Sequence, residues 1–313
     1  MELKEQLLKY LIREGPSLKE GNRVWDISHR RFLYMNPELV KKFLEMRGHE
    51  RYKQLVIDKE IDLIKHGKGV FVKELGGDNF NLIDLGCGDG IKAESFIDIF
   101  KDSKVKIKFC PVSVSKELVD LTLKNVKTKK FSSISDYTSK IACFEEADEI
   151  ISELRSTDYQ KNVILFLGSI LASFDINEYL FNISNSMFPG DYLVIGNGIR
   201  KGQRLVNLET YKHRVFREWT MPLVKELGFS DNEVEYDVKF NHIRVELIYR
   251  IKVDKEIEFN GRKISFKIGD EIMVAKLYKY FPEELEKFCK FYFSDVKILA
   301  DADGEYALVI CKK

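Results

Sequence analysis

A glycine-rich run carries the clearest chemical signal in this sequence. It reads Leu82-Ile-Asp-Leu-Gly-Cys-Gly-Asp-Gly90, so an apolar stretch ends in three alternating glycines. Glycines let the backbone turn tightly and approach a ligand without obstruction by a Cβ atom. The helix expected after the turn presents its N-terminus to the same place. The pattern predicts a ligand site, and the alternative is a glycine-rich turn that binds nothing.

The spacing of the glycines distinguishes between kinds of ligand-binding turn. A P-loop requires G-x-x-x-x-G-K-[ST], which does not occur in the sequence. The dinucleotide fingerprint is G-x-G-x-x-G, whereas here the third glycine comes one position earlier, as G-x-G-x-G. Preceded by Asp84, this shorter form resembles motif I of the class I methyltransferases that depend on S-adenosylmethionine (SAM).

Strands and helices alternate regularly around this run. Apolar stretches predict strands at residues 80–85, 105–114, 141–144, 163–167 and 192–195, and helical periodicity predicts helices at 91–100, 116–126, 147–154 and 176–187. This alternation predicts an α/β fold with a doubly wound, Rossmann-like parallel sheet. A helix at 282–291 precedes two further strands, 296–300 and 306–311, which resemble the C-terminal antiparallel hairpin of class I methyltransferases.

The other segments have different periodicities. Residues 1–65 and 200–228 read as helices, whereas residues 233–273 alternate with a period of two. Asn241 and the pair Asn260-Gly261 are turn signals within that alternating segment. These patterns predict an N-terminal helical segment (1–65), a doubly wound core (66–197 and 283–313) and an inserted α+β domain (198–282). The resemblance to methyltransferases implies that the core binds SAM and that the inserted domain, with the N-terminal segment packed on it, binds the substrate.

Further motifs narrow the resemblance to one family. Pro111-Val-Ser-Val-Ser115, Leu165-Phe-Leu-Gly-Ser169, Phe188-Pro-Gly-Asp191 and Gly269-Asp-Glu271 resemble the histidine-specific N-alpha-methyltransferases, which trimethylate histidine in ergothioneine biosynthesis. The resemblance covers most of the chain from about residue 50 onward and implies SAM as the cofactor. In that family the glycine loop and its lysine hold the methionine portion and the ribose. The implied cofactor-binding residues are Asp84, Gly86, Cys87, Gly88, Gly90, Lys92, Ser113, Phe144 and Gly168.

Two positions at the implied cofactor site depart from the family pattern. The family has an aspartate that grips the ribose hydroxyls where this sequence has Ser113. A serine cannot offer a bidentate carboxylate to two hydroxyls. The family also has an Asp-Phe pair that meets the adenine, and here the pair is Cys143-Phe144. Phe144 can still pack on a ring, but the polar partner for the adenine amino group is missing.

The implied substrate-binding residues depart further. An asparagine, a glutamate and a serine that hold the amino acid in the family correspond here to Ser173, Ala275 and Leu277. One tyrosine of the family's substrate domain corresponds to Tyr211. Replacing a carboxylate by alanine removes the anchor for a cationic amine, so we expect a substrate other than histidine.

Three hypotheses follow. The first is a SAM-dependent N-methyltransferase acting on a small amine or amino-acid-like molecule. Its chemistry needs mainly orientation and electrostatics, and a general base, if present, would be a tyrosine such as Tyr211 or a bound water. The second is an inactive methyltransferase fold that serves as a binding or scaffold module. The third is an enzyme that uses SAM for another transfer or uses a related nucleoside.

Composition limits the other options. Lys and Arg total 51 against 50 Asp and Glu, so the net charge of +1 gives no support to a nucleic-acid binder. No apolar run reaches the length of a membrane helix, and the five cysteines are widely spaced without a CxxC pair. No histidine spacing indicates a metal site. We expect a soluble, cytoplasmic monomer or weak dimer that acts on a small molecule.

Overall fold

The computed structural model describes residues 2–19, 21–200, 208–241 and 243–313. The chain forms two compact units, each made of two segments. The core unit comprises Arg51–Arg204 and Lys279–Lys313, and the second unit comprises Met1–Glu50 and Leu205–Tyr278. The glycine-rich run belongs to the core unit.

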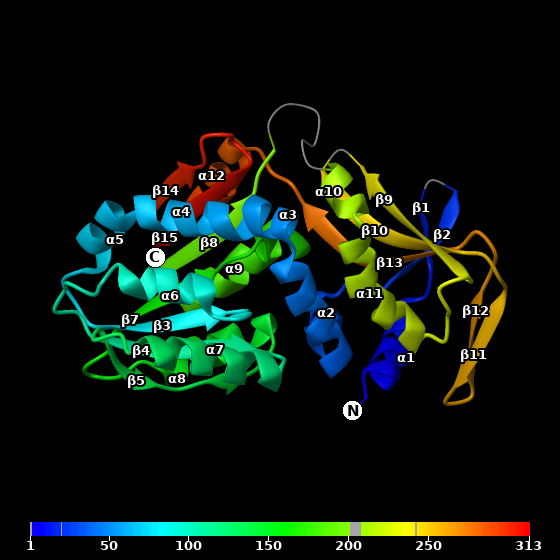
Figure 1. Cartoon of the computed structure of the whole chain (residues 1–313), viewed down its shortest axis with the longest axis horizontal. Helices are drawn as coiled ribbons and strands as arrows, with labels where there is room; N and C mark the ends of the chain where they lie inside the picture. Colours follow the sequence, from blue (N-terminus) through cyan, green and yellow to red (C-terminus); the bar gives the residue numbers. More distant parts are fainter. Residues whose placement is uncertain (1, 20, 201–207, 242) are drawn as a thin grey trace. The chain divides into compact units, whose positions relative to one another are not determined.

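The core unit is built on one mixed sheet. Its strands lie in the order β14-β15-β8-β7-β3-β4-β5 (Figure 1). They are β3 (Phe80–Leu85), β4 (Ile107–Ser113), β5 (Ile134–Tyr137), β7 (Lys161–Phe166), β8 (Tyr192–Gly198), β14 (Asp295–Ala300) and β15 (Tyr306–Lys312). Strands β5, β4, β3, β7 and β8 are parallel, whereas β15 runs antiparallel to β8 and β14. The order in which the chain adds strands to the sheet reverses at β3: β4 and β5 lie on one side of it, and β7 and β8 on the other. Doubly wound folds bind ligands at the carboxyl ends of the strands beside such a point.

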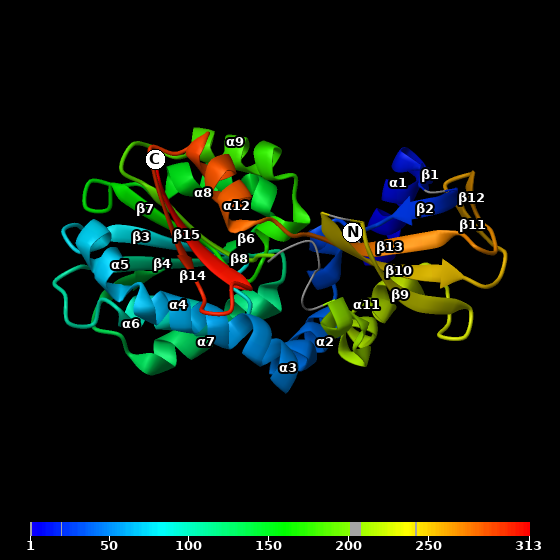
Figure 2. The same cartoon turned by 90° about the horizontal axis from the view of Figure 1, so that it is seen from above.

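Helices cover both faces of this sheet. Figure 2 shows one set of helices on each side of the strands. One face carries α4 (Lys59–His66), α5 (Lys68–Leu75), α6 (Ile91–Asp98) and α7 (Lys116–Lys129), and the other carries α8 (Ala147–Glu153), α9 (Ile176–Ser186) and α12 (Pro282–Lys290). Side chains of β3 alternate between the two cores, Leu82 toward the first set and Ile83 toward the second. Because both faces are buried, all six residues of β3 are buried.

The predicted α/β class is confirmed, and most predicted elements of the core unit lie within a few residues of the observed ones. Strand β5 was not predicted, because two of its four residues are exposed and it contains no apolar run. The strand predicted at 141–144 is wrong beyond Ile141. A two-residue strand, β6 (Lys140–Ile141), pairs with β4, and Phe144–Glu146 then forms a 3₁₀ turn that leads into α8.

The second unit contains a five-stranded sheet in the order β1-β2-β13-β10-β9. Its strands are β1 (Ser17–Lys19), β2 (Asn22–Asp26), β9 (Val234–Phe240), β10 (Arg244–Ile251) and β13 (Glu271–Tyr278), and a separate hairpin consists of β11 (Lys255–Phe259) and β12 (Arg262–Phe266). Its helices are α1 (Leu3–Glu14), α2 (Pro37–Gly48), α10 (Leu208–Lys212) and α11 (Arg214–Glu226), with a 3₁₀ turn at Arg30–Tyr34. Asn260 and Gly261 have φ of 50° and 72°, as the predicted hairpin turn requires.

The prediction of helices throughout residues 1–65 is wrong at 17–26, where β1 and β2 form a hairpin. Strand β2 pairs in parallel with β13, where Trp25 lies opposite Ile272. The Trp25 indole N–H also donates to the carboxylate of Asp270, which directly precedes β13 and lies 245 residues further along the chain, at 2.9 Å. Such distant pairing leaves no local periodicity to detect. Part of the predicted helical stretch 200–228 falls on residues 201–207, which lie outside the described residues.

The boundaries of the two units differ from the boundaries of the three expected parts. A continuous helical run consists of α3 (Glu50–Tyr52), a π-helical turn (Lys53–Asp58) and α4, and from Arg51 onward it belongs to the core unit. A substrate-binding role for the inserted part stays a prediction. None of the described helices combines the length and apolar character needed to cross a bilayer.

Asp191 explains the Phe-Pro-Gly-Asp motif that precedes β8. Its fully buried carboxylate accepts hydrogen bonds from the backbone N–H groups of Asn162 (2.8 Å) and Phe188 (2.9 Å). The Arg155 guanidinium pairs with it at 2.5 Å. These contacts hold together the amino ends of β7 and β8, so the motif stabilises the sheet at the edge opposite the glycine turn.

The substitution Asp191→Asn should therefore lower the free energy of unfolding by about 3 kcal/mol, because it leaves the half-buried Arg155 guanidinium and a buried backbone donor poorly matched. Urea denaturation would measure the change as a lower midpoint with an unchanged slope. Asp78→Asn is the matched control. Asp78 pairs with Lys161 at 2.7 Å, but its side chain is 70% exposed, so its loss should cost less than about 1 kcal/mol. Equal effects of the two substitutions would contradict the assignment.

Candidate cofactor site

The glycine turn lies at the carboxyl end of β3. Gly86, Gly88 and Gly90 all adopt left-handed backbone conformations, with φ of 82°, 60° and 84°. The N–H groups of Gly86 and Cys87 both donate to the Val112 carbonyl oxygen, at 2.9 and 3.2 Å, which ties the turn to β4. Three such φ values in five residues are compatible with glycine and strained for other residues, so the sequence pattern has a conformational cause.

Helix α7 holds the turn from the side. The Thr122 hydroxyl donates to the Gly88 carbonyl oxygen at 3.2 Å, and the Asn125 amide donates to the Asp89 carbonyl oxygen at 2.8 Å. Neither residue could be predicted from the sequence, because a single polar side chain on a helix gives the same pattern whether it is solvated or bonded to a neighbouring loop. They fix the shape of the turn before any ligand is present.

Gly86 also has a packing reason to be glycine. A Cβ atom there would lie 2.4 Å from Cδ1 of Ile170 and 3.0 Å from the ring of Phe144. The glycine pattern predicts close approach of a ligand here, whereas the nearest groups to that Cβ position are two side chains of the protein. The structure thus brings two predicted cofactor residues, Gly86 and Phe144, into contact.

Lys92 and Gly168 form a second group of predicted residues that lie together. Lys92, in the first turn of α6, is buried, and a Cβ atom on Gly168 would lie 2.9 Å from its Nζ atom. The loop after β7 is fastened to β8, because Ser169 N–H donates to the Gly196 carbonyl oxygen (2.9 Å) and Ser169 Oγ accepts from Gly198 N–H (3.0 Å). Lys92 therefore faces a loop whose position is fixed.

The residue missed at this place is Glu60. This fully buried glutamate of α4 pairs with Lys92 Nζ and accepts from Gly168 N–H at 2.9 and 3.1 Å. A signal was available: Glu60 precedes Leu63 and Ile64 by three and four residues, so it shares the apolar face of its helix. A carboxylate on such a face must find buried donors.

Ser113 lies at the carboxyl end of β4, beside the turn, and is buried. Its hydroxyl oxygen accepts from Ser115 N–H at 3.2 Å. Ser115 in turn caps α7 by accepting from Leu118 N–H at 3.3 Å, and its hydroxyl donates to the Glu117 carboxylate at 2.8 Å. A role of Ser113 at the cofactor ribose stays a prediction from the family resemblance.

Cys87 is not a nucleophile of the kind that needs a thiolate. Burial, and then the neighbouring Asp84 carboxylate, raise the pKa of the Cys87 thiol far above its usual value, so it stays protonated. The half-buried Cys143 begins a 3₁₀ turn, and its N–H donates to the Glu146 carboxylate at 2.6 Å. Phe144 follows it and reaches the glycine turn.

The predicted substrate residues do not share one unit. Ser173 ends a 3₁₀ turn (Leu171–Ser173) in the core unit. Ala275 and Leu277 lie on β13 of the second unit, opposite Leu247 and Val245 of β10. Tyr211, on α10 of the second unit, packs on the Phe216 ring, with ring centroids 5.2 Å apart, and its carbonyl oxygen accepts from the Tyr236 hydroxyl at 2.6 Å. Their joint role stays a prediction.

An acidic cluster on the β14–β15 connection has the spacing of a metal site. Asp301, Asp303 and Glu305 bring their carboxylates close together. Lys59 Nζ, however, lies 2.6 to 3.0 Å from all three and supplies the positive charge itself. Burial lowers the pKa of Lys59, but its hydrogen bonds to the carboxylates outweigh burial and raise it above its usual value. The cluster anchors α4 rather than calling for a metal.

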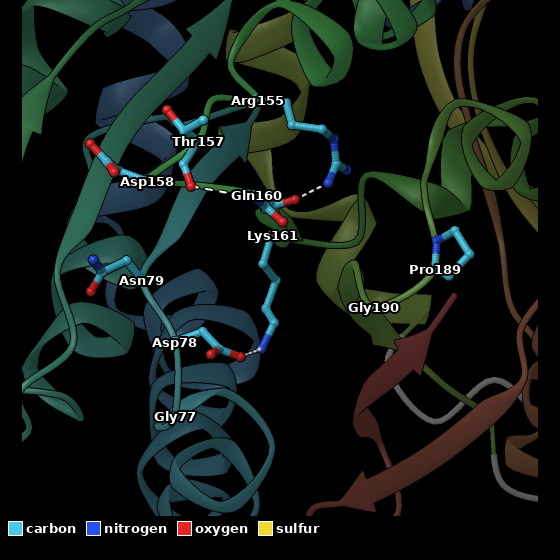
Figure 3. Close-up of a pocket in the computed structure, with 10 residues that line it drawn as sticks. All are labelled: Gly77, Asp78, Asn79, Arg155, Thr157, Asp158, Gln160, Lys161, Pro189 and Gly190. Atoms are coloured by element: carbon cyan, nitrogen blue, oxygen red, sulfur yellow. Dashed lines mark hydrogen bonds and ion pairs between the residues drawn. The ribbon is translucent and has the colours of Figure 1, made fainter.

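A polar cavity of about 590 Å³ lies at the opposite edge of the sheet (Figure 3). Its lining comes from the segments that precede β3, β7 and β8, including Asp78, Arg155, Lys161 and Gly190. In Figure 3, the cations already face partners: Arg155 points to Gln160, and Lys161 points to Asp78. Because doubly wound folds bind their ligands at the carboxyl ends of the strands, this cavity is separate from the candidate cofactor site.

Comparison with solved structures finds methyltransferases. Among them are the CurJ carbon methyltransferase (12% identity, TM-score 0.43), the SAM-dependent methyltransferase SibL (10%, 0.46) and a putative O-methyltransferase from Nostoc punctiforme PCC 73102 (10%, 0.42). They match over 81%, 87% and 98% of this chain, which spans 53%, 58% and 83% of theirs. No curated protein sequence matches the chain.

A family model described as histidine-specific methyltransferase, SAM-dependent, matches residues 49–313. This match confirms the family and the cofactor that the sequence motifs predicted. Since it spans most of the chain, the protein belongs to the histidine-specific, SAM-dependent methyltransferase family, and SAM is its cofactor.

Proposed function

We propose that the protein transfers a methyl group from SAM to the nitrogen of a small amine or amino-acid-like molecule other than histidine. The observation that carries the proposal is the grouping of the glycine turn, Phe144, Lys92 and Gly168 at the carboxyl edge of the sheet. This edge, beside the point where the strand order reverses, is where such folds hold nucleotide-like ligands.

The residues of the candidate site fit some parts of SAM better than others. The Lys92 ammonium, a cation among buried groups, suits the carboxylate of the methionine portion, and Phe144 offers a ring face for the adenine. Ser113 offers one hydroxyl to the ribose, where a carboxylate would accept from two hydroxyls. We therefore expect the methionine end to be held more firmly than the ribose.

Bound there, SAM would supply an electrophilic methyl group, which an amine nitrogen takes with its lone pair as the carbon–sulfur bond breaks. The residues of this chain then have three tasks: binding, orientation and exclusion of water. Apolar side chains such as Ile170 and Phe144 beside the turn serve the last task. Such a transfer needs a neutral amine held in line more than it needs a strong acid or base.

The residues at the predicted substrate positions limit the kind of molecule that can accept the methyl group. Ala275 is buried and Leu277 half-buried on β13, and neither side chain has an acceptor atom for a cationic amino group. A buried ammonium without a carboxylate or other acceptor is costly. We infer an acceptor with an apolar part and an amine, and we propose that histidine is not the substrate.

Isothermal titration with S-adenosylhomocysteine should give a micromolar dissociation constant, because the methionine and adenine contacts remain. Gly88→Arg should abolish binding by filling the turn. Gly190→Arg is the matched control: Gly190 also has a positive φ (+94°), but it lies at the opposite edge with no atom within 4 Å of its Cβ position. Absence of binding at millimolar ligand would favour the inactive, scaffold interpretation.

In a mass-spectrometric assay of amines with SAM, methylated histidine would contradict the proposed specificity.

Ser113→Asp should tighten binding of S-adenosylhomocysteine by about tenfold, the effect of one charge-assisted hydrogen bond to the ribose hydroxyls. Titration of Ser113→Asn, of similar size but uncharged, is the control and should show no comparable gain. The gain in affinity should also appear with adenosine as the ligand, and it should vanish with 2′,3′-dideoxyadenosine, which lacks both ribose hydroxyls. If Asp brings no gain over Ser, the ribose is held by other residues.

A further inference from the structure

Glu60 is a fully buried carboxylate on α4, held by groups from three other elements. Its oxygens accept from Gly168 N–H (2.9 and 3.1 Å) and from the Tyr306 hydroxyl of β15 (2.9 Å), and they pair with the Lys92 ammonium of α6. Isolated buried carboxylates are strongly disfavoured. Here each oxygen has donors, so the surroundings are built for a charged group.

Gly196 on β8 gives independent evidence for this design. A Cβ atom at that position would lie 1.5 Å from Oε1 of Glu60. The φ of Gly196 is not in the left-handed region, so its backbone conformation does not require glycine. The absence of a side chain in the middle of a buried strand is thus explained by the carboxylate that occupies the space.

Tyr306 acts as a donor to Glu60 and not as an acid or base. Burial, and then the negative charge of Glu60, raise the pKa of the Tyr306 hydroxyl well above its usual value, so the hydroxyl keeps its proton. Its oxygen also lies 3.5 Å from the Ser169 hydroxyl, on the loop that contains Gly168. The carboxylate and the loop are thereby connected twice.

We propose that Glu60 is a positioning residue, which holds the Lys92 ammonium and the Gly168 peptide in place for the amino-acid end of SAM. This inference rests on the proposed cofactor site. Glu60 does not itself contact the cofactor, since it has no exposed surface and its oxygens already accept from protein donors. The adenosine end of the cofactor should be indifferent to it.

Two ligands separate this role from a merely structural one. S-Adenosylhomocysteine carries the amino-acid end, whereas 5′-methylthioadenosine keeps the adenosine and the sulfur but lacks that end. Glu60→Gln should weaken binding of the first at least tenfold and change binding of the second less than twofold, as measured by isothermal titration. The reason is that an amide has one acceptor oxygen and a donor NH₂ group, so it cannot satisfy Lys92, Gly168 and Tyr306 together.

Lys92→Met should reproduce this ligand selectivity, and the double variant should bind S-adenosylhomocysteine no more weakly than the worse single variant, because the two residues act as one unit. Tyr306→Phe serves if Glu60→Gln fails to fold. It removes one donor without changing a charge, and it should weaken binding of S-adenosylhomocysteine alone, by a few-fold.

Asp191→Asn is the matched control, a buried carboxylate with an ion pair and backbone donors at the far edge of the sheet. It should leave the ratio of the two affinities unchanged. Equal loss of both ligands in Glu60→Gln and Tyr306→Phe, or no loss of either, would overturn the inference while leaving the proposed function intact. A wild-type protein that binds neither ligand would instead refute the proposed function itself.

Discussion

The Glu60 carboxylate joins parts of the core unit that are distant in sequence. It connects α4 to the first turn of α6, to the loop after β7 and to β15, and it lies against the backbone of β8. A buried negative charge without donors would destabilise the fold by several kcal/mol. The core can therefore close only when helix, loop and strand all reach their places, which also sets the geometry of the candidate cofactor site.

Lys59, the residue before Glu60, also links α4 to the β14–β15 hairpin. It binds the three carboxylates of the β14–β15 connection, while Glu60 binds Tyr306 on the strand that follows. Two consecutive residues of α4 thus hold one hairpin, Lys59 through ion pairs and Glu60 through a hydrogen bond. The π-helical turn at Lys53–Asp58 lies directly before them, and such turns alter which side chains a helix presents to its neighbours.

Much of the core unit could be predicted from the sequence, because its signals are local. The apolar run of β3, the glycines after it and the periodicity of α6 and α7 each fall within a short window. The residues that shape the site could not be found in that way. Thr122 and Asn125 resemble solvated helix residues, and Glu60 acquires its meaning only from Lys92 and Tyr306, which are far away in sequence.

The sequence has the glycine turn that the family resemblance predicts, while the same resemblance predicts carboxylates near the ribose and adenine where this chain has Ser113 and Cys143. The structure shows the conformation of the turn, whereas the change of polar partners at the adenosine end stays a prediction. In the second unit, the pairing of β2 with β13 was equally out of reach of sequence patterns, because a three-residue register between Val24–Asp26 and Glu271–Met273 defines it. Recognition of a family thus informed the fold more than the individual contacts.

The 246 residues that separate Glu60 from Tyr306 have a consequence for synthesis on the ribosome. Helix α4 and the parallel strands emerge early, but β15, which completes the sheet beside β8, emerges only after the inserted segment. Until then Glu60 lacks its hydroxyl donor and β8 has an open edge. The nascent core must wait as an incomplete sheet, and this interval is when the chain most needs protection from aggregation.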